Sequence, residues 1–237
     1  MGRRLTQMNA DLYWKDDNEL FEIARRELYT AVVGDIMDKL DLQRQFLPPQ
    51  IQPLAADMVA VGRAMTVLEA DISDDSGSDT VQSKPFGLML EALDGLRSGE
   101  IYVCTGASPT YALWGELMSM RAMKLGSAGA VLNGYSRDTR GILKLGFPTF
   151  SWGRYAQDQA PRGKVVDFRI PVDIAGTRVE SGDIIFGDLD GVCVVPKGAE
   201  QEVFAKAIEK ARGEKTVGKA LQAGLSAGEA FAKYGIL

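Results

Sequence analysis

Between residues 86 and 152 the sequence alternates apolar segments of helical spacing with short apolar runs. The helical segments cover residues 86–96 and 115–125, and the short runs cover residues 101–104, 130–132 and 149–152. Strands separated by helices pair in parallel, because each crossover helix returns the chain to the same end of the sheet. This alternation restricts the chain to an α/β fold in which helices cover a sheet with parallel strands.

Two helices and one long strand are expected before this alternation. Apolar residues at helical spacing predict helices over residues 18–28 and 31–40, and Asn18 is the expected N-cap of the first. An apolar run over residues 58–68 predicts a long strand, and its Gly62 is typical of a bulge or a bend.

After the alternation the pattern changes to short strands and then to helices. The strands are separated by Gly and Asp turns and are typical of hairpins added to the same sheet. They are expected at residues 165–170, 177–179, 183–186 and 192–195. A helix is expected over residues 199–212, and a capping box at Ser226 and Glu229 begins a last helix. The last helix carries an apolar stripe that faces either its own core or a neighbouring subunit, namely Ala227, Ala230, Phe231 and Tyr234.

Two segments are expected to stay outside the packed core. Residues 71–84 are acidic and rich in serine, and their small apolar surface favours a solvated loop over a lid. Residues 1–6 formally fit an N-myristoylation pattern, but so short a motif often matches by chance, and a frayed terminus is favoured.

The composition is that of a soluble globular protein. Hydrophobic residues are 46% and charged residues 25% of the 237, and the net charge is −5. This acidic balance creates no overall field that attracts a polyanion, so nucleic acid is not an expected partner. The sequence contains no long apolar run of the kind that spans a membrane, and neither a membrane partner nor export is expected.

The chain contains no histidine and only two cysteines, Cys104 and Cys193. This excludes Ser-His-Asp and Cys-His catalysis as well as a thiolate zinc cluster or a disulfide framework. The cysteine usage favours a reduced, cytoplasmic setting. A metal in this protein would be held mainly by carboxylates, carbonyls and water, which suit Mg²⁺, Mn²⁺ or Ca²⁺.

Three other patterns are better explained as structure than as sites. The glycines of segment 126–129 follow a helix and precede a strand, which predicts a helix C-cap and not a phosphate loop. Segment 188–191 lacks the ligand spacing of a calcium loop, so a hairpin turn is expected there. Three lysines have polar or turn-like neighbours and are expected on the solvated surface, not as Schiff bases; these are Lys84, Lys144 and Lys164.

Residues 106–138 contain the strongest candidate site. Gly115-Glu116-Leu117-Met118 begins a helix, whose unpaired first-turn amides can receive an anion. Arg137-Asp138 follows the strand at 130–132 and a turn, near the carboxyl end of a sheet strand, where ligand sites of α/β proteins lie. The segments together describe a site for a hard metal ion with an anionic organic ligand. On spacing alone, an Arg–Asp surface pair beside a charged helix start fits equally well.

The motif formed by Glu116, residues 126–134 and Arg137-Asp138 resembles the signature of the RraA-like family. That family contains divalent-metal aldolases of the 4-hydroxy-4-methyl-2-oxoglutarate class. Further similar segments are residues 30–40, 62–67, 98–103 and 181–196. The resemblance implies a single domain over residues 1–237, with a β/β/α swivelling-domain core at about 30–208 and helical extensions at 1–29 and 209–237. It also implies a mixed central sheet flanked by helices, and a homotrimer or dimer of trimers with active sites at subunit boundaries.

The resemblance also implies a role for each residue of the motif. Asp138 is the direct ligand of a Mg²⁺ or Mn²⁺ ion, and Glu116 contacts the metal through water. Arg137 contacts the keto acid, while the helix start at Gly115, Leu117 and Met118 receives the pyruvate carboxylate. This sequence has Glu116 where the family pattern often has aspartate, which lengthens that side chain.

The implied activity is that of a class II, metal-dependent pyruvate aldolase. Such an enzyme cleaves 4-hydroxy-2-oxo acids to pyruvate and also decarboxylates oxaloacetate, because both reactions pass through a pyruvate enolate that a metal ion stabilises. The alternative is a non-catalytic binding protein that regulates an RNA-degrading endonuclease, as other members of the family do. Retention of Glu116, Arg137 and Asp138 favours the enzyme. A methyltransferase is not supported, because no glycine-rich loop follows a strand in the required order.

Overall fold

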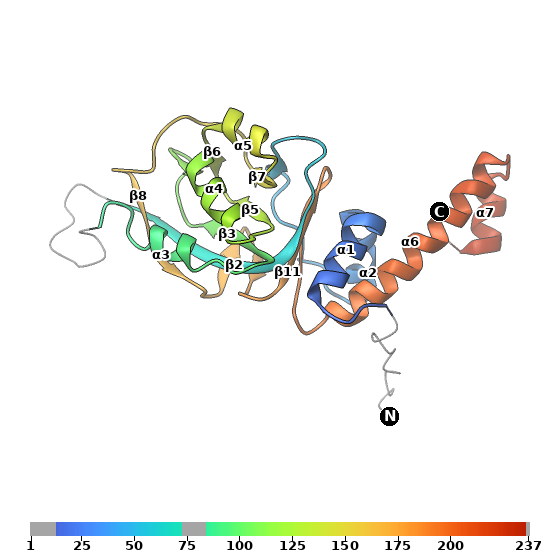
Figure 1. Ribbon diagram of the computed structural model, residues 1–237. Coiled ribbons are helices and arrows are strands. Elements are labelled where there is room, and N and C mark those ends of the chain that lie inside the picture. Colours follow the sequence, from blue (N-terminus) through green and yellow to red (C-terminus); the bar gives the residue numbers. More distant parts are fainter. Residues whose placement is uncertain (1–12, 73–83, 236–237) are drawn as a thin grey trace, which may run out of the picture.

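The computed structural model describes residues 13–72 and 84–235 (Figure 1). Residues 1–6 and most of the acidic segment 71–84 lie outside this range, so neither of those expectations is tested. The described part of segment 71–84 begins as strand, because Asp71 is the last residue of β2.

The central feature is a mixed eight-stranded sheet. Its strand order is β1-β7-β5-β3-β2-β11-β12, with β8 also paired to β2. Strands β2, β3, β5 and β7 run parallel, while β11 and β8 run antiparallel to β2. The bounds are β1 (Gln52–Pro53), β2 (Ala60–Asp71), β3 (Glu100–Thr105), β5 (Gly129–Leu132), β7 (Thr149–Ser151), β8 (Gly163–Phe168), β11 (Ile184–Asp188) and β12 (Gly191–Val195). The expected α/β fold with a mixed sheet flanked by helices is confirmed.

Two small strand pairs lie outside this sheet. β4 (Ala112–Trp114) pairs in parallel with β6 (Tyr135–Ser136), and β9 (Val172–Ile174) pairs antiparallel with β10 (Thr177–Val179). The β9–β10 hairpin covers one face of the central sheet, where its valines and isoleucine join a core cluster with Ile101 and Val103 of β3.

Seven helices are present in the described residues. They are α1 (Asp17–Glu27), α2 (Thr30–Lys39), α3 (Met89–Asp94), α4 (Glu116–Lys124), α5 (Thr139–Leu145), α6 (Glu200–Gln222) and α7 (Ala227–Tyr234). Helices α1 to α6 contact the face of the sheet opposite to the hairpin, because successive residues of a strand point to opposite faces, whereas α7 packs on α6. Tyr102 and Cys104 of β3 pack in the cluster with α3 and α4, while Val61 of β2 packs in the cluster with α1, α2 and α6.

Several details differ from the expectations. The N-cap of α1 is Asp16 and not Asn18, because the Asp16 carboxylate accepts a hydrogen bond from Glu19 N at 3.0 Å. The register shift of β2 lies between Leu68 and Glu69 and not at Gly62. Residue 62 is instead a glycine for steric reasons, because a Cβ atom there would overlap the carbonyl oxygen of Gly99.

The C-terminal helices form an arm. Helix α6 is longer than expected and extends past the body of the molecule, and α7 packs near its far end (Figure 1). The expected capping box at Ser226 and Glu229 is present. Of the apolar stripe on α7, Ala230 is buried whereas Phe231 is 59% exposed, so Phe231 does not face the core of its own chain.

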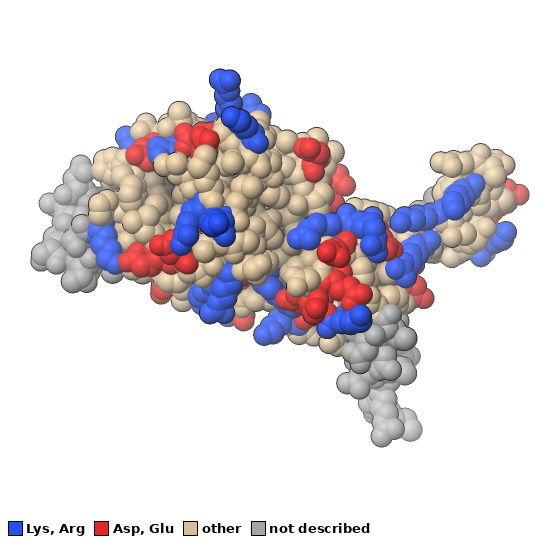
Figure 2. Space-filling view, in the orientation of Figure 1, with Lys and Arg blue, Asp and Glu red and all other residues tan. Residues whose placement is uncertain are grey.

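Acidic and basic side chains interleave where α1, α2 and α6 meet (Figure 2). Arg63 of β2 forms ion pairs with Asp17 of α1 and Glu200 of α6, and Arg212 of α6 bonds Glu27 at 2.8 Å. No single sign of charge dominates this part of the surface, and the pairs fasten α1 and α6 to the sheet.

Candidate active site

The two halves of the candidate motif are joined by the β4–β6 pair. In this parallel pair Trp114 lies opposite Ser136, and Arg137 N donates a hydrogen bond to the carbonyl oxygen of Trp114 at 2.9 Å. The pair therefore places the start of α4 directly beside the start of α5. The sequence predicts that Glu116 returns beside Asp138, and in the structure the residue of the α4 start that lies against the Asp138 carboxylate is Gly115.

Gly115 allows the Asp138 carboxylate to approach the start of α4. A Cβ atom at residue 115 would lie 2.7 Å from Asp138 Oδ2, closer than Cβ atoms come to other heavy atoms. Gly115 is the N-cap residue of α4 and provides no side-chain cap. The first-turn amides of α4, which Glu116, Leu117 and Met118 contribute, therefore remain available to an anion.

Asp138 stands at the N-cap position of α5 but does not cap that helix. Its φ of 55° lies in the left-handed region, which a residue other than glycine adopts at a cost in free energy. No hydrogen bond from the Asp138 side chain caps α5, and the side chain is 48% exposed. The backbone geometry thus turns this carboxylate away from its own helix and toward Gly115.

Arg137 is held by carboxylates on both sides. Its Nη1 lies 2.9 Å from Asp158 Oδ1, and its Nε lies 3.7 Å from Asp138 Oδ2. Asp158 belongs to the loop 153–162, which is fastened by Ala112 N donating to Gln157 O at 2.9 Å. The sequence pattern gives no signal for Asp158, because it lies in an irregular loop twenty residues beyond the motif.

These groups share a cavity of about 280 Å³. Its polar lining consists of Arg137, Asp138, Asp158 and Gln159. Its apolar lining comes from α3 and the residues before it, and from β4 and α4, namely Phe86, Met89, Leu90, Leu93, Ala112, Leu113, Trp114, Leu117 and Met118. Of the expected site residues, Gly115, Leu117, Met118, Arg137 and Asp138 line this cavity.

Glu116 does not line the cavity. Its side chain lies over the first turn of α5, where a Cβ atom at Gly141 would overlap the Glu116 carboxylate. It therefore shares the α4–α5 junction with Asp138 but points along a different side of it. The metal role that the resemblance implies for Glu116 stays a prediction.

A buried acid lies behind the cavity wall. Glu69 of β2 is only 2% exposed, and its Oε1 accepts a hydrogen bond from Gln159 Nε2 at 2.7 Å. Burial raises the pKa of Glu69 to about 8, although hydrogen bonds from Gln159 and Tyr111 act in the opposite direction. Glu69 connects the central sheet to the loop that carries Asp158.

The carboxylates at the cavity fit a divalent cation of the Mg²⁺ type. The described residues form no cluster of three or more His, Cys, Asp or Glu side chains that could hold a metal ion. Mg²⁺ does not need such a cluster, because it usually keeps several waters and binds one or two carboxylates together with substrate oxygens. The Asp138 carboxylate, half-exposed and without a capping bond, is a donor of this kind.

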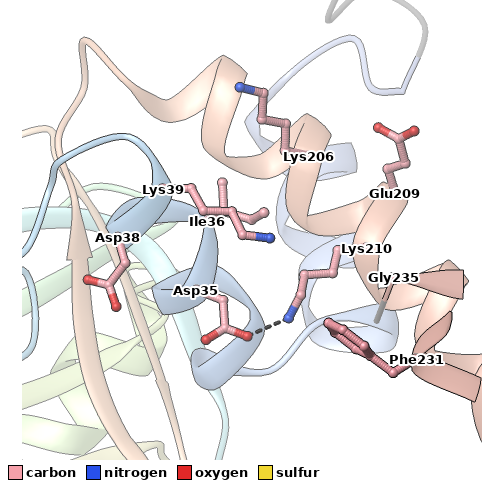
Figure 3. Close-up of a pocket in the computed structure, with 9 residues that line it drawn as sticks. All are labelled: Asp35, Ile36, Asp38, Lys39, Lys206, Glu209, Lys210, Phe231 and Gly235. Atoms are coloured by element: carbon pink, nitrogen blue, oxygen red, sulfur yellow. Dashed lines mark hydrogen bonds and ion pairs between the residues drawn. The ribbon is translucent and has the colours of Figure 1, made fainter. Parts of the chain in front are cut away.

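A larger cavity lies elsewhere, between α2, α6 and α7, and measures about 850 Å³ (Figure 3). Lys210 of α6 points to Asp35 of α2 and forms an ion pair with it, and the Phe231 ring lies close by. The cavity is wide and lined by charges of both signs. It contains none of the expected site residues.

The remaining sequence expectations have mixed outcomes. Gly126 follows α4 with a φ of 80°, as a helix C-cap requires, and segment 188–191 forms the turn between β11 and β12. Lys84 and Lys144 are exposed as expected. Lys164 is not: it lies within β8 and is 8% exposed, because that strand pairs with the buried part of β2. None of the three lines the smaller cavity.

Both cysteines are buried and unpaired with each other, as expected of a chain without a disulfide framework. Among the helices that the structure describes, none has the length and apolarity needed to cross a membrane.

Comparison with known proteins identifies the family. The model of the RraA-like family (Aldolase/RraA) matches residues 30–194. A Halalkalibacterium halodurans protein named "Putative 4-hydroxy-4-methyl-2-oxoglutarate aldolase" is 32% identical over 186 residues, which are 78% of this chain and 80% of that protein.

Two solved structures share the fold. An uncharacterized protein from Pseudomonas syringae pv. tomato is 24% identical with a TM-score of 0.80, over 94% of this chain and 97% of that one. RraAS2 of Streptomyces coelicolor, described as an unusual member of the RNase ES inhibitor RraA protein family, is 22% identical with a TM-score of 0.73, over 86% and 98% of the two chains. The family match covers most of the chain and includes both halves of the motif, and this protein therefore belongs to the RraA-like family.

Proposed function

We propose that this protein is a divalent-metal-dependent carbon–carbon lyase that cleaves 4-hydroxy-2-oxo acids to pyruvate and also decarboxylates oxaloacetate. One observation carries the proposal: the Arg137 guanidinium, the Asp138 carboxylate and the uncapped start of α4 lie around one cavity. These are the groups needed to bind a 2-oxo acid and to stabilise negative charge on it. The name of the Halalkalibacterium halodurans relative supports the same reaction class.

The chain's own residues would bind and orient the substrate. The first-turn amides of α4 receive the carboxylate, because they have no side-chain cap and the helix dipole favours an anion there. Arg137, held in place by Asp158, directs its positive charge at the oxygen that becomes negative in the transition state. Asp158 is the cavity carboxylate not assigned to the metal, and it would hold the proton released from the C4 hydroxyl group.

Asp138 would hold Mg²⁺ or Mn²⁺ directly, and Glu116 would contact the ion through water. The bound ion would act as a Lewis acid toward the enolate and lower its free energy by several kcal/mol. The homotrimer or dimer of trimers that the resemblance implies stays a prediction, and light scattering of the purified protein tests it.

Removal of divalent metal should abolish pyruvate release. Protein stripped with a chelator is expected to be inactive on oxaloacetate and on 4-hydroxy-4-methyl-2-oxoglutarate, and to regain activity when Mg²⁺ or Mn²⁺ is returned. Activity that survives chelation would contradict the metal mechanism. Borohydride trapping followed by mass spectrometry is the companion measurement, since a lysine adduct would indicate Schiff-base chemistry. Failure to release pyruvate under all conditions would favour the regulatory binding protein.

Replacing Gly115 by alanine should lower kcat at least roughly tenfold, because the new Cβ displaces the Asp138 carboxylate and small displacements of reacting groups are costly. Gly198→Ala is the matched control, since a Cβ at residue 198 meets nothing within 4 Å. Steady-state kinetics on both variants tests this expectation. Equal turnover of the two variants would show that the close approach of Asp138 to residue 115 is not used in catalysis.

A further inference from the structure

The smaller cavity has two chemically different parts. Its charged lining comes from the start of α5 and from the loop 153–162, and its apolar lining comes from α3 and from the β4–α4 segment. Helices α3 and α4 pack against each other on the same face of the sheet (Figure 1). A 2-oxo acid bound at Arg137 and the start of α4 therefore has apolar side chains as its other neighbours.

The side chains that this chain contributes to the cavity offer no free cation to a second carboxylate. Among the described residues that line the cavity, Arg137 is the one cation, and it already pairs with Asp158 at 2.9 Å. Two nearby cations do not line the cavity: Lys84 pairs with Glu91 of α3, and Arg121 bonds Asp94 at 2.7 Å. A carboxylate placed against the apolar wall would lose its hydration without gaining a partner, which is strongly unfavourable.

Part of the apolar lining of the cavity is exposed and does not pack in the chain's own core. Leu90 of α3 is 55% exposed and Leu117 of α4 is 78% exposed, although the side chains behind them, such as Trp114 and Leu93, are buried. A ligand with an apolar group would bury part of this exposed surface, and removing apolar surface from water favours binding.

We propose that the substrate is a 4-hydroxy-2-oxo acid with an uncharged alkyl or aryl group at C4 in place of a second carboxylate. This inference rests on the function proposed above and narrows its substrate class. In the reaction the C3–C4 bond breaks, the C4 hydroxyl loses its proton and becomes the carbonyl of an aldehyde or ketone, and the bonding electron pair passes to the pyruvate enolate. The enolate then takes up a proton at C3, so no oxidant or reductant is needed.

The test compares substrates that differ only at C4. With Mg²⁺ present, kcat/KM should be at least roughly tenfold higher for 4-hydroxy-2-oxopentanoate and 4-hydroxy-4-phenyl-2-oxobutanoate than for 4-hydroxy-2-oxoglutarate. Leu90→Arg should reverse this order, because it adds a cation to the wall at a half-exposed position that the fold does not need. Leu221→Arg on α6, at a site that is 38% exposed and remote from the cavity, is the matched control and should keep the order.

Calorimetry separates failure of this inference from failure of the proposed function. Phenylpyruvate and 2-oxoglutarate serve as ligands that are not cleaved at C3–C4. Phenylpyruvate should bind more tightly than 2-oxoglutarate to the wild-type protein and to Leu221→Arg. It should not do so with Leu90→Arg. Cleavage with a preference for 4-hydroxy-2-oxoglutarate would overturn the apolar substrate class and leave the lyase intact. Absence of cleavage for every substrate would overturn the lyase itself. Equal binding of the two oxo acids would overturn the inference in either case.

Discussion

Arg137→Lys should lower kcat by roughly 10²–10³-fold while leaving metal affinity almost unchanged, the loss typical of removing one preorganised charge-stabilising donor. Lysine keeps the positive charge but loses the planar guanidinium, which here pairs with Asp158 through Nη1 and leaves other N–H groups for the substrate. The factor by which kcat falls should exceed the factor by which KM rises, because the interaction of Arg137 with the substrate is expected to strengthen as the enolate forms.

Asp138→Ala should impair turnover in a different way from Arg137→Lys. This variant removes the proposed metal ligand, so Mg²⁺ affinity should fall and a high Mg²⁺ concentration should restore part of the turnover. The fold should survive, because the side chain is 48% exposed and does not cap α5.

Calorimetric Mg²⁺ binding and steady-state kinetics on both variants test this contrast. Arg178→Lys is the matched control, since Arg178 forms an exposed pair with Glu180 at 2.7 Å on another part of the surface. Near-normal turnover in both site variants would show that Arg137 and Asp138 form a surface ion pair without a catalytic role. Equal loss of metal affinity in both would contradict the separate roles assigned to them.

Glu69→Gln should make the protein more stable in alkaline solution and remove part of its pH dependence. Burial raises the pKa of Glu69 to about 8 in the folded protein, whereas an unfolded glutamate titrates near its model value of 4.5. The folded state therefore binds the proton more tightly. The stability that this proton provides is complete below pH 4.5 and is lost as the pH rises through 8.

The expected size follows from about 1.4 kcal/mol for each unit of pKa difference, which gives a few kcal/mol at pH 9. Glutamine is neutral at every pH and its amide oxygen can still accept the hydrogen bond from Gln159. Denaturant titrations at pH 5, 7 and 9 should therefore give diverging stabilities for the wild type and the variant. Glu202→Gln, at an exposed helical position, is the control. If the free energy of unfolding depended on pH in the same way for the wild type and the variant, the assignment of a neutral, buried Glu69 would be wrong.

The main architecture could be predicted because its elements are long and periodic. The parallel strands β3, β5 and β7 are short apolar runs separated by helices, and each was expected within one or two residues of its bounds. Helix α5 and strands β4 and β6 could not be predicted in this way. They have two to seven residues, which is too few to establish a period, and they form because the larger elements hold their ends together.

The site residues that lie close together in the sequence could be predicted, but those that the fold brings in from distant segments could not. A helix, a turn and a strand lie in sequence between Glu116 and Asp138 and predict that the two return to one place, although the residue that lies against the Asp138 carboxylate is Gly115. Asp158 and Gln159 reach the cavity from a loop, and Glu69, near the end of β2, accepts a hydrogen bond from Gln159 behind it. A buried acid in an apolar strand is visible in the sequence, but its partner is set by tertiary packing alone.

The short β4–β6 pair has a consequence for engineering. Because Arg137 N donates a hydrogen bond to the carbonyl oxygen of Trp114 at 2.9 Å, main-chain atoms fix the spacing between the start of α4 and the backbone of Arg137. Side chains at Leu90, Leu93 and Met118 can therefore be randomised in a directed-evolution library without altering that spacing. Under the proposed function, such a library would explore new acceptor aldehydes in the synthetic direction while every member keeps the same main-chain framework at the site.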